Sequence, residues 1–239
     1  MSHQADLAIR TQGLAKQYRD VGALVDLDLE VTAGEVIGYL GPNGAGKTTT
    51  IRLLLGLIRP SAGRAQIFGV DCQRRPVETH RRVAVVPGEA NLWPELTGAE
   101  TLHLLGQVHG AVDVVYRDEL IDRFELDPSK KVRTYSRGNR QKVLLIGALM
   151  TRADLLLMDE PTSGLDPNQI RGVRTLIRDL GKSKTIMIST HILQEVEPVA
   201  DRVLFIHDGK IVFDGKPDDL ARQNGNLEQA FYKLTAQPV

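Results

Sequence analysis

The sequence has a single cysteine, Cys72, among 239 residues, so no intrachain disulfide can form. This cysteine usage is compatible with a reducing compartment. No apolar run reaches the roughly 18–20 residues that a membrane-spanning helix needs. Residues 1–6 lack the pattern of a secretory signal peptide. These absences predict a chain that is soluble by itself and that reaches a membrane only through a partner.

An excess of charge of either sign is also lacking. Lysine and arginine together number 30, and aspartate and glutamate together number 30. Nucleic-acid-binding proteins usually carry a basic excess, so no nucleic-acid partner is expected. The composition does supply 42% hydrophobic residues, which suits one large domain or a domain with a subdomain.

A glycine-rich stretch fits the phosphate-binding pattern G-x-x-x-x-G-K-[ST]. The apolar run at 36–40 before it is typical of a buried strand, and residues 50–55 after it have helical character. Strand, loop and helix in this order predict nucleotide binding, whereas a plain glycine-rich turn would predict nothing. The residues predicted to bind ATP here are Gly41, Pro42, Asn43, Gly44, Ala45, Gly46, Lys47, Thr48 and Thr49.

Each residue type in this stretch has a physical reason. Gly44 and Gly46 let the backbone turn so that successive N–H groups point at phosphate oxygens, and the following helix directs its positive end there. Lys47 can reach the β- and γ-phosphates, and the Thr48 hydroxyl can bind Mg²⁺. Thr49 is placed to add a hydroxyl near the α-phosphate.

Strand and helix patterns alternate along the rest of the chain. Residues 7–31 show a period of two, typical of antiparallel strands with one wet face. Apolar runs predict buried strands at 65–70, 83–86, 155–158 and 185–189, and a hairpin at 203–214 around Asp208-Gly209. Residues 91–150 are mostly helical, with a capping box at Thr97 and Glu100 and a helix opened by Ser136. Two short surface helices are predicted over 217–235.

Four further residues are candidates for chemistry. Asp159 and Glu160 stand at the carboxyl end of the 155–158 strand, where ligands bind in open α/β sheets. One carboxylate could hold Mg²⁺ and the other could orient an attacking water, although a solvated acidic turn would look the same. His191 ends the 185–189 strand near the expected γ-phosphate. Tyr18, expected in a loop between two strand segments, could stack on a base, but taken alone it is better explained as a half-buried packing residue.

Together these motifs resemble the ATP-binding subunit of an ABC transporter over nearly the whole chain. Residues 41–48 are similar to the Walker A loop, and 155–160 to Walker B with its catalytic glutamate. Residues 163–166, which end at Asp166, resemble the D-loop. His191 falls at the switch histidine, and Tyr18 matches the adenine-stacking aromatic, which reverses its reading as a packing residue.

The diagnostic segment is Tyr-Ser-Arg-Gly-Asn-Arg-Gln at 135–141, in the place of the family signature Leu-Ser-Gly-Gly-Gln. Three positions depart from the family pattern, but Ser136 and Gly138 remain, the two with a phosphate-binding role. A second departure follows residues 83–86, where the family has a glutamine and this chain has Glu89, which could substitute as an oxygen ligand for Mg²⁺. Residues 92–97 resemble exporter-type members.

The resemblance implies an α/β fold: a P-loop NTPase (RecA-like) core with an N-terminal antiparallel β subdomain and an inserted α-helical subdomain. The expected organisation is one ABC ATPase domain over 1–239, with the core at 1–88 and 151–239 and the helical insert at 89–150. It implies catalytic roles for Glu160, His191 and Lys47, ATP contacts by Tyr18, Ser136, Gly138 and Asp166 besides 41–49, and Mg²⁺ ligation by Thr48, Asp159 and Glu89.

The resemblance also implies a function and partners. The chain would bind and hydrolyse ATP with Mg²⁺ to power export of a small molecule, drug or lipid-like substrate through a separate membrane-spanning permease. It would pair with a second ATPase subunit, a homodimer being favoured over a heterodimer. It would lie in the cytoplasm, peripheral on the inner face of the cell membrane.

Two rival readings remain. A non-transport ABC ATPase acting on ribosomes or DNA typically carries two ATPase halves or a long coiled coil, and this sequence shows neither. A P-loop kinase or GTPase would not carry the Ser136 segment, Asp159-Glu160 and His191 in this order.

Overall fold

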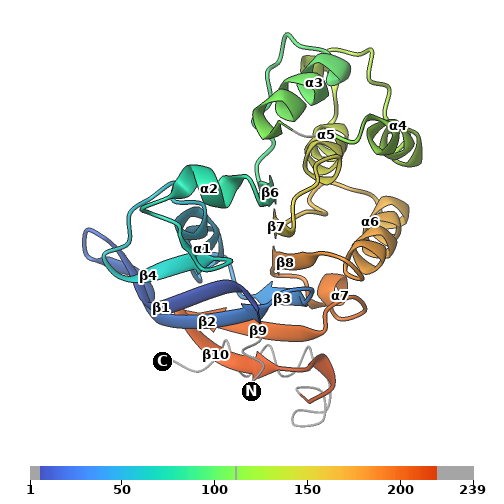
Figure 1. Ribbon diagram of the computed structural model, residues 1–239. Helices are drawn as coiled ribbons and strands as arrows, with labels where there is room; N and C mark the ends of the chain where they lie inside the picture. The colour runs from blue at the N-terminus through green and yellow to red at the C-terminus, as the bar shows by residue number, and fades with distance from the viewer. Residues whose placement is uncertain (1–5, 111, 220–239) are drawn as a thin grey trace.

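The computed structural model describes residues 6–110 and 112–219 and contains two β-sheets (Figure 1). The smaller sheet is antiparallel, in the strand order β2-β1-β4-β5. Its strands are β1 (Leu7–Tyr18), β2 (Val21–Thr32), β4 (Ala62–Ile67) and β5 (Val70–Asp71). In β2 the side chains of Leu27, Leu29 and Val31 are buried and the intervening ones are exposed, which confirms the predicted wet face.

The larger sheet has the order β10-β9-β3-β8-β7-β6 and is parallel except for the edge strand β10. Its strands are β3 (Val36–Leu40), β6 (Val83–Val86), β7 (Leu155–Asp159), β8 (Thr185–Thr190), β9 (Arg202–His207) and β10 (Lys210–Gly215). Alternate residues of β3 enter different cores: Val36 packs with one, Ile37 with the other. A sheet buried on both faces needs side chains that are apolar at every position, which explains the short apolar runs.

Helices cover both faces of this sheet. They are α1 (Lys47–Leu54), α2 (Pro76–His80), α3 (Gly98–His109), α4 (Val114–Arg123), α5 (Arg137–Leu149), α6 (Pro167–Leu180) and α7 (Leu193–Val196), with a 3₁₀ turn at Val132–Thr134. Helix α1 shares one core with the antiparallel sheet, and α5, α6 and α7 pack on the other face. Helices α3, α4 and α5 lie together at the end of the molecule away from the antiparallel sheet (Figure 1).

The helix starts follow the sequence signals. Thr97 caps α3 and Glu100 completes the capping box, as predicted. Ser136 caps α5, also as predicted. The β9–β10 turn places Asp208 at φ +45° and Gly209 at φ +75°, and two positive φ values are what a type I′ turn requires. Among the described residues, no helix combines the length and apolarity that crossing a bilayer would take.

Three local expectations were wrong or untested. The strand predicted over 65–70 is a hairpin, because Phe68 (φ +47°) and Gly69 (φ +77°) turn the chain between β4 and β5. Tyr18 is the last residue of β1 rather than part of a loop. The helices predicted over 217–235 fall almost wholly outside the described residues.

Candidate functional site

The phosphate loop joins the end of β3 to the start of α1 through residues 41–46. Gly46, at φ +112°, is the N-cap of α1. A Cβ added there would lie 2.6 Å from the Ala23 carbonyl oxygen, and one added at Gly41 would lie 2.3 Å from the Ile206 carbonyl oxygen. Both glycines are therefore needed for close backbone approach, which ties the loop to β2 and β9, and the positive φ of Gly46 also favours glycine there.

Lys47 begins α1, and its side chain is buried. The Nζ atom donates to the carbonyl oxygens of Gly41 at 2.7 Å and Pro42 at 3.0 Å, so the ammonium group lies over the loop. Burial lowers the pKa of Lys47, and the negative charges of Glu160 and Asp159 oppose this shift. The positive charge is thus held between the loop and two carboxylates.

Asp159 ends β7 and is buried, with both carboxylate oxygens bonded. Thr48 Oγ1 donates to Asp159 Oδ2 at 2.8 Å, and Ser189 Oγ donates to Oδ1. Ser189 sits opposite Asp159 in the parallel pairing of β7 with β8, so the strand register brings these groups together. A hydroxyl and a carboxylate side by side are oxygen donors of the kind that Mg²⁺ prefers, and Mg²⁺ usually takes only one or two protein carboxylates.

Glu89, the third predicted metal ligand, does not belong to a metal-binding cluster among the described residues. Residues 6–110 and 112–219 hold no cluster of three His, Cys, Asp or Glu side chains placed to bind a metal ion. The neighbouring Gly88 does lie against Asp159, since a Cβ there would be 3.4 Å from Asp159 Oδ2. The role of Glu89 stays a prediction.

Glu160 follows Asp159 in an unusual backbone conformation. Its φ is +47°, rare for a non-glycine residue, and its N–H donates to the Ser189 carbonyl oxygen at 2.9 Å. Its Oε1 lies 2.9 Å from His191 Nδ1, and Thr190 Oγ1 lies 3.3 Å from its Oε2. The turn directs the carboxylate away from Asp159 and toward the end of β8, and strained positions of this kind cluster at active sites.

The predicted base-stacking residue lies at the far end of β1. Tyr18 is 43% exposed, and Lys16 Nζ is 4.9 Å from the centre of its ring. An exposed ring face beside a cation can stack on a planar base. Its contact with adenine stays a prediction, as do those of the exposed Asn43 and the half-buried Thr49.

The signature segment packs against its own chain. Ser136 Oγ accepts from the Asn139 N–H at 3.2 Å, which leaves the first turn of α5 capped. A Cβ added at Gly138 would lie 2.7 Å from the Gly164 carbonyl oxygen, so α5 lies against the 161–165 loop. Gln141 Nε2 donates to the Pro161 carbonyl oxygen at 3.1 Å within this contact.

Two residues near the signature have clear structural roles. Asp166 caps α6, accepting from the backbone N–H groups of Asn168 at 2.9 Å and Gln169 at 3.0 Å. Its predicted ATP contact stays a prediction. Tyr135, in the place of the family leucine, is buried and donates its hydroxyl to the Asp127 carbonyl oxygen at 2.6 Å.

With this geometry described, comparison with known proteins decides the family. The model of the family described as "ABC transporter" matches residues 24–163, more than half of the chain. The chain belongs to the ABC transporter family. It is an ATP-binding subunit of that family, in which ATP hydrolysis is characteristic.

Curated relatives agree in sequence over most of the ABC chain. The daunorubicin resistance ATP-binding protein DrrA3 of Streptomyces coeruleorubidus is 40% identical over 227 residues, covering 92% of this chain and 72% of that protein. The bacitracin transport ATP-binding protein BcrA of Bacillus licheniformis is 38% identical over 220 residues, covering 90% and 72%.

Solved structures agree in fold. A structure described as the ATP-binding subunit of an ABC transporter superposes with a TM-score of 0.86 at 30% identity, covering 95% of this chain and 99% of that one. A dimeric ATP-binding cassette bound to ADP and phosphate gives a TM-score of 0.80 at 24% identity, covering 87% and 98%. These matches confirm the predicted ABC ATPase fold.

Sequence reasoning missed part of the ABC site. Ser189 bonds to Asp159, Thr190 bonds to Glu160, and Glu195 bonds to Thr190. The sequence alone singled out none of these three residues. Serine, threonine and glutamate are common residues, and only the folded arrangement of β7, β8 and α7 shows that these three lie beside the carboxylates. The two consecutive hydroxyl residues that follow the apolar run 186–188 at the end of β8 were the one available signal.

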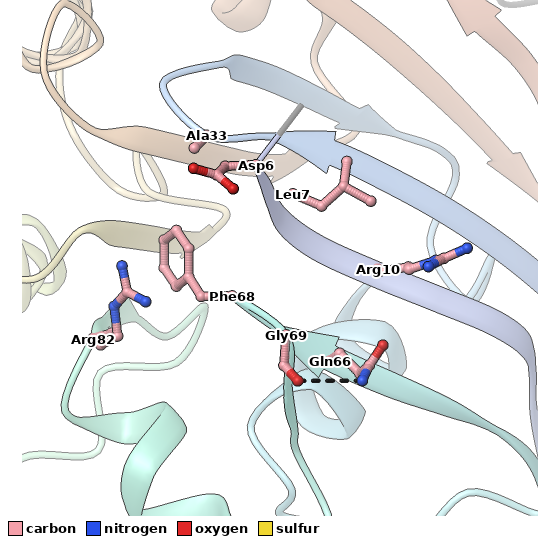
Figure 2. Close-up of a pocket in the computed structure, with 8 residues that line it drawn as sticks. All are labelled: Asp6, Leu7, Arg10, Ala33, Gln66, Phe68, Gly69 and Arg82. Carbon is pink, nitrogen blue, oxygen red and sulfur yellow. Dashed lines mark hydrogen bonds between the residues drawn. The ribbon is translucent and has the colours of Figure 1, made fainter. Parts of the chain in front are cut away.

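A separate cavity of about 470 Å³ lies near the start of β1, away from these residues (Figure 2). It is lined by Asp6, Leu7, Arg10, Ala33, Gln66, Phe68, Gly69 and Arg82. Its arginines are engaged: Arg10 pairs with Glu30 at 3.1 Å and Arg82 with Asp154 at 2.8 Å. The Arg82 guanidinium also lies 3.7 Å from the centre of the Phe68 ring. We therefore attribute the cavity to the packing of these side chains rather than to a second binding site.

Proposed function

We propose that this chain binds and hydrolyses ATP to power export of a small molecule, drug or lipid-like substrate through a separate membrane subunit. One observation carries the proposal: the phosphate loop, Asp159 and the Glu160–His191 pair converge at the carboxyl ends of β3, β7 and β8. The named roles of relatives in daunorubicin resistance, bacitracin transport and Nod factor export support export over import.

In this proposal the chain's own groups position the nucleotide. The backbone N–H groups of residues 44–48 surround the phosphates, and Lys47 leaves the loop carbonyls to reach the β- and γ-phosphates. Thr48 and Asp159 would hold Mg²⁺, which would offset negative charge on the phosphate oxygens. Because Thr48 and Asp159 already share a hydrogen bond of 2.8 Å, both oxygens are near one point.

Glu160 accepts a proton from the attacking water in this scheme. A carboxylate only accepts hydrogen bonds, so the 2.9 Å contact requires that His191 Nδ1 carries the proton. His191 thereby fixes one oxygen of Glu160, and its Nε2 can donate to the γ-phosphate when the ring carries both protons. Both side chains are partly exposed, at 24% for Glu160 and 48% for His191, so water and nucleotide can reach them.

A second copy of the chain completes the site. Gly138 packs on the 161–165 loop of its own chain, Ser136 caps the same helix, and this end of α5 would face the γ-phosphate held by the partner. We favour a homodimer over a heterodimer because one chain carries both the phosphate loop and the signature segment. The dimeric cassette noted above shows that the same fold can pair.

The permease would dock in the groove between α1, α2 and the end of α3. This groove of about 540 Å³ is largely apolar, and Leu57, Val77 and Val108 on its rim are 64%, 69% and 78% exposed. Exposed apolar side chains in one place mark interaction surfaces. Docking there would hold the chain peripherally on the inner face of the cell membrane.

The test is to purify tagged Glu160→Gln protein from native membranes with ATP and Mg²⁺, and to identify what accompanies it. The same preparation without nucleotide is the control. A co-purifying protein with several membrane-spanning helices is the expected result and would reveal the substrate path. Recovery of ribosomes or of a soluble complex instead would overturn the export function and favour a non-transport ABC ATPase.

A further inference from the structure

Glu195, on the short helix α7, is a buried carboxylate that the proposed mechanism does not use. Its side chain is only 6% exposed although glutamate is rarely buried without a partner. Oε1 accepts from Thr162 Oγ1, and Oε2 accepts from Thr190 Oγ1 at 3.0 Å. Burying a carboxylate costs free energy, so the position of Glu195 beside the predicted catalytic residues calls for an explanation.

Thr190 connects this buried carboxylate to Glu160. Thr190 is fully buried at the end of β8, and its Oγ1 lies 3.0 Å from Glu195 Oε2 and 3.3 Å from Glu160 Oε2. The same oxygen accepts from the Ile192 N–H at 3.1 Å. A threonine hydroxyl has one proton, so the two carboxylates share a single donor.

The two oxygens of Glu160 thus have different partners. His191 holds Oε1 from the exposed side, and the Thr190 hydroxyl approaches Oε2 from the buried side. Glu195 in turn holds that hydroxyl, and Thr162 anchors Glu195. We infer that Glu195 is a positioning residue for Glu160, acting through the Thr190 hydroxyl. This inference rests on the proposed ATP hydrolysis.

The physical basis is orientation. With Glu195 present, the Thr190 hydroxyl is held in one rotamer, and its single proton is shared between Glu195 Oε2 and Glu160 Oε2. Without Glu195 the hydroxyl is free to turn, and Glu160 loses the fixed partner on Oε2. A carboxylate that is misplaced by about 1 Å relative to its water loses rate on the order of a hundredfold, whereas ATP binding through the phosphate loop is untouched.

The experiment measures ATP hydrolysis and ATP binding for the full 239-residue chain bearing Glu195→Ala. We expect kcat to fall about tenfold or more, with the Kd for ATP and the melting temperature close to those of the unsubstituted chain. Glu197→Ala is the matched control, because Glu197 lies two residues further on and is exposed. A wild-type kcat for Glu195→Ala, or a loss that appears equally in Glu197→Ala, would overturn the inference.

Two further variants test the route through Thr190 even if Glu195→Ala fails to fold. Thr190→Ser keeps the hydroxyl and should keep most of kcat, whereas Thr190→Val keeps the shape and should lose as much as Glu195→Ala. Equal activities of Thr190→Ser and Thr190→Val would contradict the inference.

The Glu160→Gln background separates this inference from the proposed function. If Glu195 acts through Glu160, adding Glu195→Ala to Glu160→Gln should cause no further loss, a non-additivity expected of residues that act as one unit. A further tenfold loss there would show that Glu195 acts elsewhere. Wild-type turnover by Glu160→Gln alone would instead overturn the proposed catalytic role.

Discussion

The phosphate-loop end of the sheet and the signature end of α5 differ in how far their bonds reach. At the first, Thr48 bonds Asp159 across 111 residues of sequence, and Asp159 bonds Ser189 on the adjacent strand. At the second, Ser136 Oγ accepts from the Asn139 N–H of its own helix, and Gln141 donates to the Pro161 carbonyl oxygen 20 residues away. The first region is joined across neighbouring strands of the sheet, and the second joins a helix end to a nearby loop. This difference fits the proposal that each chain carries two half-sites.

The largest effect is expected from a substitution at the phosphate-loop end of the sheet, where the two regions differ most. Glu160→Gln keeps the size of the side chain but removes its ability to accept a proton from water. We expect turnover to fall roughly 10²–10⁴-fold while ATP still binds, measured by phosphate release and by nucleotide binding. Turnover at the normal rate would show that Glu160 is not the catalytic carboxylate.

The second prediction concerns the cation of the same half. Lys47→Ala removes the charged donor and should cost about 1.5–3 kcal/mol of ATP-binding free energy and abolish turnover, as seen by calorimetry and phosphate release. Lys182→Ala is the control, since that side chain is 74% exposed and pairs with the exposed Asp179. Normal ATP turnover by Lys47→Ala would contradict the assignment of residues 41–48 as a phosphate-binding loop.

A smaller effect is expected at Glu89, whose role as a Mg²⁺ ligand stays a prediction. Glu89→Ala should raise the Mg²⁺ concentration for half-maximal hydrolysis by a few-fold, because the predicted role of Glu89 is to supply one oxygen donor to the ion. The measurement is a titration of activity with Mg²⁺ at saturating ATP. An unchanged titration would mean that Glu89 does not replace the glutamine usual in the family.

The smallest effect belongs to the helical block. Thr97→Ala removes the side-chain cap of α3, because Thr97 Oγ1 accepts from the Glu100 N–H at 3.2 Å. It should lower the free energy of unfolding by about 1 kcal/mol without changing ATP affinity, measured by denaturant unfolding and nucleotide titration. A loss of ATP affinity would show that the block and the phosphate loop are coupled within one chain.

The sequence predicted what depends on local patterns. The glycine spacing located the loop, apolar runs located β3, β7 and β8, and the capping residues Thr97 and Ser136 located two helix starts. Motifs of a known family then named the site residues before any fold was known. These signals are strong because each residue type meets a demand of its own backbone.

What the sequence did not predict depends on strand order and on unusual turns. The parallel pairing of Leu40 with Thr190 and of Asp159 with Ser189 brings hydroxyl groups beside the carboxylates, and nothing local to β8 announces it. Phe68 was assigned to a strand because it lies within the run 65–70, and a positive φ is rare for a bulky non-glycine residue. Its turn is held by contact with Arg82, which is 14 residues away in sequence.

The central claim, that the working site joins two chains, is tested most directly by mixing two inactive variants. Lys47→Ala removes the phosphate-loop cation. Gly138→Ala disturbs the signature, because its Cβ would lie 2.7 Å from the Gly164 carbonyl oxygen. Gly172→Ala, at a helical glycine with nothing within 4 Å of the added Cβ, is the matched control and should stay active.

Phosphate release by the mixture of Lys47→Ala and Gly138→Ala chains is the measurement. A mixed dimer contains one site with both an intact phosphate loop and an intact signature, so the account predicts that activity returns on mixing. Mixtures that stay as inactive as either variant alone, at every ratio, would contradict it.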